Sequence, residues 1–271
     1  MADIGASTKM AHELRAVYTL WLREMTRFVT EWTRVVGALA QPLIFLLIFG
    51  IGLNSTFRGG ALLPPGFSYT QFMFPGILGM SVLFTSLFSS ISVIWDREFG
   101  FLKEILVAPI SQSSIVLGKM LGGATQALIQ GTILLLLMPF LGLWPGMVGV
   151  LKLWLIMFLI AITLSGLGLA LASRMSSMEG FQMIMNFVVM PLWMLSGAFF
   201  PLQGVPSWME FLMRIDPLTY AVDALRGVMY GSSPLAKALV AHTFSFDLTI
   251  VALLALGAFI LALLLFRRGE G

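Results

Sequence analysis

The sequence predicts an all-α integral membrane protein, with six transmembrane helices in a single domain over residues 1–271. Hydrophobic residues make up 58% of the chain and charged residues only 11%, whereas a soluble domain carries about 25% charged residues. The mean hydropathy is +0.95. The apolar stretches are continuous rather than alternating, which favours helices over a β-barrel. Soluble enzymes, secreted disulfide scaffolds and disordered regulators are therefore excluded.

Gaps between charged residues place the six spans, because a helix needs about 20 mainly apolar residues to cross the hydrocarbon core. The gap from 120 to 151 is too long for one span, and the turn sequence LGLWPG at 141–146 divides it. The predicted spans lie near 35–53, 72–94, 117–140, 148–171, 181–200 and 248–266.

Lys and Arg in the connecting segments predict the orientation. With six spans both ends of the chain share a side, and that side carries eleven of these residues: Lys9, Arg15, Arg23, Arg27, Arg34, Arg97, Lys103, Lys119, Arg174, Arg267 and Arg268. The opposite side carries five: Arg58, Lys152, Arg214, Arg226 and Lys237. Both termini are therefore expected in the cytoplasm. The first 34 residues are amphipathic and charged, so they do not resemble a secretory signal.

The segment 10–34 before the first span predicts an amphipathic interface helix. Its apolar residues recur at steps of three and four and so share one helix face: Leu14, Tyr18, Trp21, Met25, Phe28 and Trp32. On the polar side, Glu24 with Arg27 and Arg27 with Glu31 are spaced to pair, and Arg23 adds a further positive charge. Such a helix either anchors the first span passively or also contacts a cytoplasmic partner.

Charges cluster again in the cytoplasmic connection at 95–114, although the chain otherwise avoids charge. A short helix is expected over 96–110, because Phe101 with Ile105 and Leu102 with Leu106 share helical faces and Pro109 stops the helix. This segment is either a solvated hairpin at the membrane surface or a docking surface for another protein.

The outer connection, residues 201–247, contains a second helix signal. Asp216 followed by Pro217 is an N-cap with proline at the first helical position, and Gly231 is a C-terminal stop, so a helix is expected near 217–230. It is expected outside the hydrocarbon core or dipping shallowly into it, with Asp223 and Arg226 paired on its surface. Its role is either structural capping or gating of substrate release.

Several kinds of chemistry have no sequence support. The chain has no Cys and only His12 and His242, so no metal site and no catalytic site are predicted. The run SSIVLGKM at 113–120 departs from the phosphate-binding P-loop at its first Gly and after its Lys. Polar residues inside the spans, such as Gln41, Gln126, Gln130 and Asn186, are interpreted as helix contacts rather than ligand contacts.

Two segments are similar to the type-2 permeases of ABC transporters, of the daunorubicin-resistance and nodulation-export type. The first is DREFGFLKEILVAPISQSSIVLGKMLGG at 96–123, with its acidic and basic pair, a Gly, a Leu-rich step and a Pro after a short helix. The second, before the last span, is LSGAFFPLQGVPSWMEFLMRIDPLTYAVDALRG at 195–227. The amphipathic start, the six spans and the length also fit, so the resemblance covers nearly the whole chain.

The resemblance implies the permease subunit of an exporter in the cytoplasmic membrane of a bacterium or archaeon. The chain would be no enzyme by itself and would hold no cofactor, since ATP and Mg would bind two copies of a separate ATPase subunit. Two permease chains would pair, as a homodimer or with a different second chain. Membrane lipid is the other expected contact, and no nucleic acid is expected.

The resemblance also implies roles for residues. The short helix expected over 96–110 would be a coupling helix that sits in a cleft of the ATPase. Its contact residues would be Asp96, Arg97, Glu98, Gly100, Phe101, Leu102, Lys103, Glu104, Leu106 and Pro109. The 10–34 helix would touch the same ATPase through Trp21, Arg23, Arg27 and Glu31. The second and fifth spans would line the transport path, with candidates Phe84, Phe88, Met185, Phe187 and Met190. An outer gate would involve Asp216, Pro217, Asp223 and Arg226.

An apolar path with Phe and flexible Met, without buried charge, favours a hydrophobic or amphipathic cargo such as a drug or a lipid. Export of lipid-linked polysaccharide is the alternative within the family. The four tyrosines, Tyr18, Tyr69, Tyr220 and Tyr230, lie outside the predicted spans, which argues against a path lined for sugars. A membrane enzyme, a channel and a secondary transporter stay as further alternatives, although the sequence offers neither a convergent polar cluster nor ion sites for them.

Overall fold

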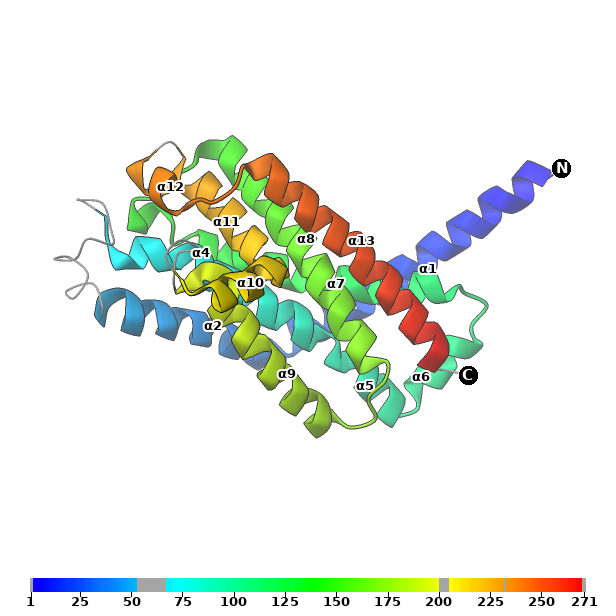
Figure 1. Ribbon diagram of the computed structural model, residues 1–271. Coiled ribbons are helices and arrows are strands. Elements are labelled where there is room, and N and C mark those ends of the chain that lie inside the picture. Colours follow the sequence, from blue (N-terminus) through cyan, green and yellow to red (C-terminus); the bar gives the residue numbers. More distant parts are fainter. Residues whose placement is uncertain (1, 53–66, 200–204, 232, 270–271) are drawn as a thin grey trace.

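A computed structural model of the chain describes residues 2–52, 67–199, 205–231 and 233–269. Within these ranges all the regular structure is helical, which confirms the all-α fold class (Figure 1). Long helices lie side by side as a bundle, and one extended helix, α1, projects from one end of it.

The chain begins with two helices that meet at a sharp bend. Helix α1 covers Ala2–Thr30, and α2 covers Trp32–Phe45 and continues as the π-helical turn η1, Leu46–Ile51. The axes of Lys9–Thr30 and Val35–Gly50 differ by 70°. The predicted surface helix and the predicted first span are thus separate helices, although α1 begins earlier than the predicted residue 10.

The remaining long helices form the body of the bundle. Helix α4 (Tyr69–Ser89) starts at a capping box made by Ser68 and Gln71 and is followed at once by α5 (Ile91–Glu98). The others are α7 (Gln112–Leu135), α8 (Gly146–Ala172), α9 (Met178–Trp193) with its extension η3 (Met194–Ala198), and α13 (Phe244–Gly269). Between α7 and α8, the short η2 (Pro139–Leu141) and two glycines at positive φ, Gly142 and Gly146, make the turn that the LGLWPG sequence predicts.

Among the described residues, four helical segments are long and apolar enough to cross a membrane, namely 69–98, 146–172, 178–198 and 244–267. The number is five if the bent pair of α1 and α2 forms one further span. Helix α7, with 24 residues, is about 36 Å long and could also cross, but its Gly, Gln and Ser residues lower its hydropathy. The count of six spans therefore stays a prediction. Residues 53 and 200, at the ends of two predicted spans, and Arg58 lie outside the described residues.

The two ends of the bundle differ in character (Figure 1). One end carries α1, α5, the short helix α6 (Phe101–Val107) and the C-terminal end of α13. Towards the opposite end lie α10 (Ser207–Ile215), α11 (Pro217–Tyr230) and α12 (Pro234–Leu239). The two ends of the chain thus lie on the same side of the bundle, as the even number of spans predicts.

Helix α11 begins and ends at the predicted residues, but it is not a surface helix. Asp216 caps it by accepting a hydrogen bond from the backbone N–H of Leu218 at 2.8 Å, and Gly231 follows its end at positive φ. The apolar face of α11 is fully buried against α4, α8 and α13. The expected position outside the hydrocarbon core, or dipping shallowly into it, stays a prediction. The expected surface position of Asp223 and Arg226 is wrong, because both side chains are buried.

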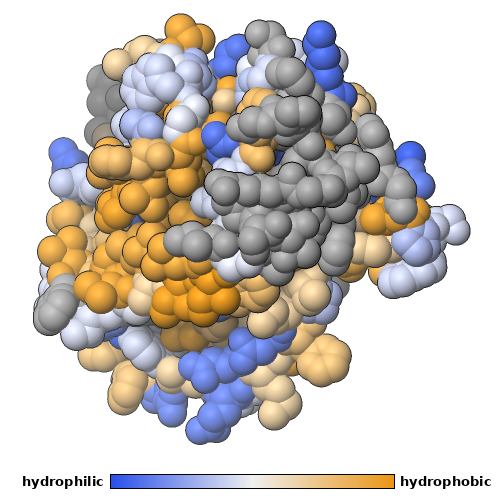
Figure 2. All heavy atoms as spheres, turned by 90° about the vertical axis from the view of Figure 1, so that its left-hand side faces the viewer, coloured by the Kyte–Doolittle hydropathy of each residue, from blue (hydrophilic) through white to orange (hydrophobic). Residues whose placement is uncertain are grey.

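The flank of the bundle presents apolar side chains outward, as a lipid-facing surface requires. Figure 2 looks at the end of the molecule that carries α12 and shows orange hydrophobic residues over much of the visible flank. The exposed apolar residues of the three spanning helices α8, α9 and α13 include Leu151, Trp154, Leu155, Met183, Ile184, Phe187, Leu253, Leu256, Ile260 and Leu264. A soluble protein does not expose so much apolar surface, so this is a multi-pass membrane protein.

Candidate coupling and transport site

The charged connection at 95–114 forms an exposed turn at one end of the bundle. The single predicted helix over 96–110 is in fact two helices, α5 and α6, separated by Gly100 at a φ of +81°. This left-handed conformation suits glycine and reverses the chain direction. Glu98, Phe99, Phe101, Lys103, Glu104 and Val107 are exposed here, and we call residues 98–107 the exposed turn.

The inner face of the exposed turn is packed against the bundle. Leu102 is buried and Leu106 is half-buried, so Leu102 supports the turn instead of offering an outward apolar contact. Two exposed apolar side chains were not predicted: Phe99, 70% exposed, and Val107, 86% exposed. Residue Ala108 is extended, which ends α6 before Pro109 as the steric demand of a proline requires.

Helix α1 lies directly against this turn, so the two segments predicted to meet a partner also meet each other. The guanidinium of Arg23 forms an ion pair with Asp96 and lies 5.9 Å from the ring centre of Phe101. Arg27 stacks on Trp95, with 4.2 Å between the guanidinium carbon and the ring centre. Arg27 and Glu31 pair at 3.5 Å, as their spacing predicts.

Behind the turn, a buried charge network joins α1, α5 and α7. Lys119 Nζ lies 2.7 Å from an Asp96 carboxylate oxygen and 3.1 Å from a Glu24 carboxylate oxygen, and all three residues are buried. The spacing in the sequence predicts that Glu24 pairs with Arg27. In the structure Glu24 pairs with Lys119 instead. Because Asp96 is only 2% exposed, it has no surface to offer a partner and is instead the centre of this internal network.

The Arg97 side chain also binds within the protein instead of facing a partner. It donates hydrogen bonds to the backbone carbonyls of Met175 and Ser173, at 2.7 and 2.9 Å. These bonds tie α5 to the connection between α8 and α9. Of the predicted charged contacts, Glu98, Lys103 and Glu104 are the ones that the structure leaves exposed on the turn.

Helices α1 and α7 approach closely at two glycines. A Cβ atom at Gly118 would lie 2.7 Å from Leu20 Cβ, and one at Gly122 would lie 2.8 Å from Glu24 Cβ. Trp21 adds a hydrogen bond to the Thr125 hydroxyl at 3.0 Å. Nearer the start of α7, hydrogen bonds from Ser114 and Ser111 lower the pKa of the Glu13 carboxyl to about 2.

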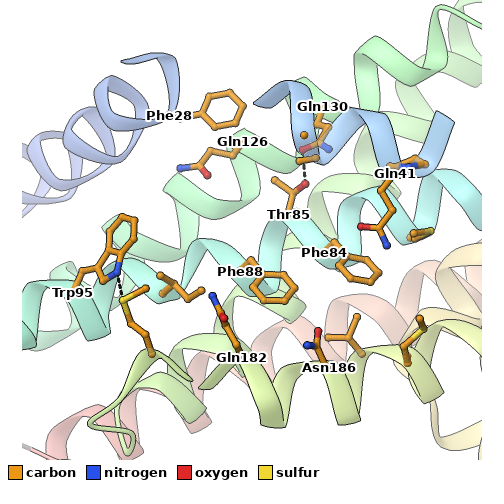
Figure 3. A pocket seen from close by; sticks show the side chains of 18 residues that line it. Phe28, Gln41, Phe84, Thr85, Phe88, Trp95, Gln126, Gln130, Gln182 and Asn186 are labelled. Carbon is orange, nitrogen blue, oxygen red and sulfur yellow. Dashed lines mark hydrogen bonds between the residues drawn. The ribbon is translucent and has the colours of Figure 1, made fainter. Parts of the chain in front are cut away.

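A cavity of about 800 Å³ opens between α1, α2, α4–α5, α7 and α9 (Figure 3). Its size is within the range of small-molecule sites. Four aromatic residues line it, Phe28, Phe84, Phe88 and Trp95, and the rings of Phe84 and Phe88 stack with centres 5.9 Å apart. Five carboxamide side chains line it as well: Gln41, Gln126, Gln130, Gln182 and Asn186.

Of the five residues predicted to line the transport path, three line this cavity and two do not. Phe84, Phe88 and Met190 line the cavity. The other two do not line it: Met185, whose side chain is fully buried, and Phe187, which is 84% exposed. Gln182 and Asn186, which are four residues apart and so share one face of α9, are among the residues of this helix that face the cavity.

Four of the five carboxamides are residues that the sequence analysis interpreted as helix contacts, and the fifth, Gln182, was not singled out from the sequence. Two of them do make such contacts: Gln130 accepts a hydrogen bond from Thr85, and Gln126 donates one to the Glu24 carbonyl at 3.3 Å. Gln41, Gln182 and Asn186 are exposed residues whose amides project into the cavity (Figure 3). Gln182 and Asn186 are four residues apart in α9, and this spacing is the sequence signal that could have placed them on one helix face.

At the far end of the bundle, the predicted Asp223–Arg226 pair is wrong. Arg226 is fully buried and donates to the carbonyl of Gly197 at 2.5 Å, with its guanidinium over the ring of Phe72. Asp223 accepts hydrogen bonds from the backbone N–H groups of Ala241 and His242. The two side chains three residues apart thus bind different elements, and Asp223, His242 and Asp247 come together instead.

Comparison with known proteins is consistent with these features. The family model described as ABC-2 type transporter matches residues 15–230. A putative transport permease, ycf38, of Cyanophora paradoxa is 31% identical over 202 residues, which are 73% of this chain and 69% of the relative. Nodulation protein J of Rhizobium meliloti is 28% identical, covering 78% and 82% of the two chains. The inner membrane transport permease YadH of Escherichia coli is 26% identical, covering 94% and 96%.

Proposed function

The chain belongs to the ABC-2 type transporter family, and from this premise we propose that it is the permease of an ABC exporter for an amphipathic, drug-like or lipid-like substrate. Permeases of this family lack a nucleotide-binding domain and act with a separate ATP-binding subunit. In our proposal two copies of that subunit bind ATP and Mg²⁺ on the cytoplasmic side, and two permease chains pair as a homodimer in the inner membrane.

One observation carries the proposal: a single helical path, α4 and α5, leads from the wall of the cavity to the exposed turn. Phe84, Phe88 and Trp95 line the cavity from this path, and Glu98 at its end belongs to the turn. Asp96 lies between Trp95 and Glu98 and forms an ion pair with Lys119 of α7. Gln126 and Gln130, also of α7, form another wall of the cavity. A displacement of the turn is therefore transmitted to two walls of the cavity through packed helices and a buried ion pair.

This arrangement suggests how ATP hydrolysis on a partner would drive transport. The turn presents exposed Glu98, Lys103 and Glu104 beside exposed Phe99, Phe101 and Val107, a mixture of charge and apolar surface that suits a protein contact. Closure of the ATPase subunits would move this turn together with α1, which is bonded to it through Arg23. The cavity would then switch between an inward-open and an outward-open state.

Charge removal on the exposed turn tests the proposal. The double variant Glu98→Gln/Glu104→Gln is expected to reduce co-purification of the ATPase by about tenfold, equivalent to roughly 1.4 kcal/mol of binding, and to lose transport while the chain stays inserted. The measurement is a mild-detergent pull-down with ATP hydrolysis read in the eluate. Glu210→Gln, at the other end of the bundle, is the matched control. Unchanged partner recovery and transport in the double variant would contradict the coupling role.

The lining of the cavity also favours a second candidate substrate, a lipid-linked polysaccharide. Carboxamides hydrogen-bond to hydroxyl groups, and aromatic rings stack on the apolar faces of sugars, so this cavity offers both kinds of contact. The same groups suit an amphipathic small molecule with one polar portion. We place the amphipathic substrate first because the cavity also contains Met80, Met178, Met190 and Val189.

Paired cavity variants separate the two substrates. For a drug-like or lipid-like cargo, Phe88→Ala is expected to reduce transport about tenfold and Gln182→Ala/Asn186→Ala only a few-fold. For a saccharide cargo the order reverses, because unmatched hydroxyl groups carry the larger penalty. Transport into inverted vesicles of an amphipathic dye and of a lipid-linked oligosaccharide provides the two measurements. Phe187→Ala, at an exposed residue that does not line the cavity, is the control.

A further inference from the structure

Three side chains with metal-binding atoms converge at the end of the bundle that carries α12, although the sequence gives no metal motif. They are Asp223 of α11, His242 of the connection between α12 and α13, and Asp247 in the first turn of α13. One ligand atom from each lies within 4.8 Å of the others. Asp223 is separated in sequence from His242 and Asp247, so the packing of α11 on α13 brings it to them.

The distances fit a metal ion better than they fit direct hydrogen bonds. His242 Nδ1 lies 3.3 Å from Asp223 Oδ2 and 3.5 Å from Asp247 Oδ1. Ligands bound about 2.1 Å from a tetrahedral metal ion are separated by about 3.4 Å. His242 Nδ1 has no hydrogen-bond partner among the described residues, although two carboxylates lie this close to it.

Asp247 provides an independent observation that favours a bound cation here. Its side chain is 0% exposed, and neither carboxylate oxygen has a hydrogen-bond partner among the described residues. A buried carboxylate without partners is strongly unfavourable, and a bound cation removes that penalty. Two basic side chains of the neighbouring elements are engaged elsewhere: Arg226 with Gly197 and Phe72, and Lys152 over the ring of Phe244.

The surroundings hold two of the ligands in place and leave a route of entry. Backbone N–H groups of Ala241 and His242 donate to the Asp223 carboxylate at 2.8 to 3.1 Å, which fixes its orientation. The imidazole of His242 stacks on Phe246, with 5.0 Å between ring centres. The His242 side chain is 32% exposed, so an ion can reach the cluster from outside.

We propose that Asp223, His242 and Asp247 bind one divalent transition-metal ion, for which Zn²⁺ is the best match, with water in the fourth position. An imidazole with two carboxylates suits Zn²⁺, whereas Mg²⁺ and Ca²⁺ prefer sites made of oxygen alone. The ion joins α11 to the start of α13 and thereby fixes the outer helices to the last span. This site is separate from the cavity and does not depend on the proposed transport activity.

Metal binding to the purified full-length chain tests the site directly. After dialysis against a chelator, the chain in detergent is equilibrated with buffered Zn²⁺, and bound metal is measured by elemental analysis. We expect one ion per chain, with binding roughly tenfold or more weaker in His242→Gln and in Asp247→Asn. His12→Gln removes the other histidine of the chain and is expected to bind like the original protein.

Thermal unfolding distinguishes loss of a ligand from loss of the fold. Zn²⁺ is expected to raise the unfolding midpoint of the original protein and of His12→Gln but not that of Asp247→Asn. The metal-free Asp247→Asn variant is expected to be at least as stable as the metal-free original, because it lacks the buried charge. Absence of stoichiometric Zn²⁺ binding, or equal binding by all variants, would overturn the proposal.

Discussion

At the scale of single residues, the most informative side chain is Lys119, which the sequence presents as part of a failed P-loop resemblance. Its ammonium group is buried between Asp96 and Glu24 and also lies 3.4 Å from the Ser92 hydroxyl. Two carboxylates around one ammonium leave a net negative charge, which Arg23 offsets from the edge of the network. The network therefore depends on every member, because each missing partner leaves a buried charge without compensation.

Lys119→Met is expected to destabilise the chain by about 3 to 5 kcal/mol, since Glu24 would be left as an uncompensated buried carboxylate and Asp96 would keep only the partly exposed Arg23. Denaturant unfolding in detergent, followed by tryptophan fluorescence, measures the loss. The control is Lys103→Met, which removes an exposed ammonium group from the turn and is expected to change stability by less than about 0.5 kcal/mol. Equal stability of the two variants would show that the network does not hold α1 to α5 and α7.

At the scale of elements, helices α1 and α7 pack through Gly118 and Gly122, two glycines whose role the sequence alone does not reveal. Small residues spaced four apart are common by chance in apolar helices, so Gly118 and Gly122 carry little information in the sequence. In the structure they form the face on which Leu20 and Glu24 of α1 lie. The amphipathic pattern of α1 predicted a helix on the membrane surface, whereas part of its apolar face is buried on α7 and Leu14 and Tyr18 stay exposed.

Gly118→Val is expected to separate α1 from α7, because even the added Cβ would lie 2.7 Å from Leu20 Cβ. Overpacking of this kind costs about 1 to 3 kcal/mol. Hydrogen exchange should accordingly become faster across the middle of α1 while the exchange of α8 and α13 is unchanged. Gly257→Val in α13, where nothing lies within 4 Å of the added Cβ, is the matched control. Protection of α1 equal to that of the original chain would argue against this contact.

At the scale of the whole molecule, the two ends of the bundle differ in what they present. One end holds the exposed turn, the end of α13 and α1, and the other holds α12 and the Asp223–His242–Asp247 cluster. The uneven distribution of Lys and Arg predicts that the first end faces the cytoplasm. The cavity lies between the two ends, which is the position that the proposed transport path requires.

Single cysteines test this orientation without background labelling, because the chain has no Cys. Ser207→Cys, exposed at the start of α10, is expected to react with a membrane-impermeant maleimide in intact cells. Phe99→Cys, on the exposed turn, is expected to react only after the membrane is opened. Reaction of Phe99→Cys in intact cells would reverse the topology and remove the exposed turn from any cytoplasmic ATPase.

The sequence by itself determined the helical membrane class, most helix positions and the family, because hydropathy, helix caps and the 96–123 and 195–227 segments are local signals. Asp216, Pro217 and Gly231 predicted α11 to the residue for the same reason. Only the tertiary structure decided which side chains meet. It brought Lys119 to Asp96, turned Gln182 and Asn186 into the cavity and Phe187 out of it, and joined Asp223 to His242 and Asp247. Such contacts depend on the rotation and packing of distant helices, and in an apolar helix the hydropathy alone does not fix which face turns inward.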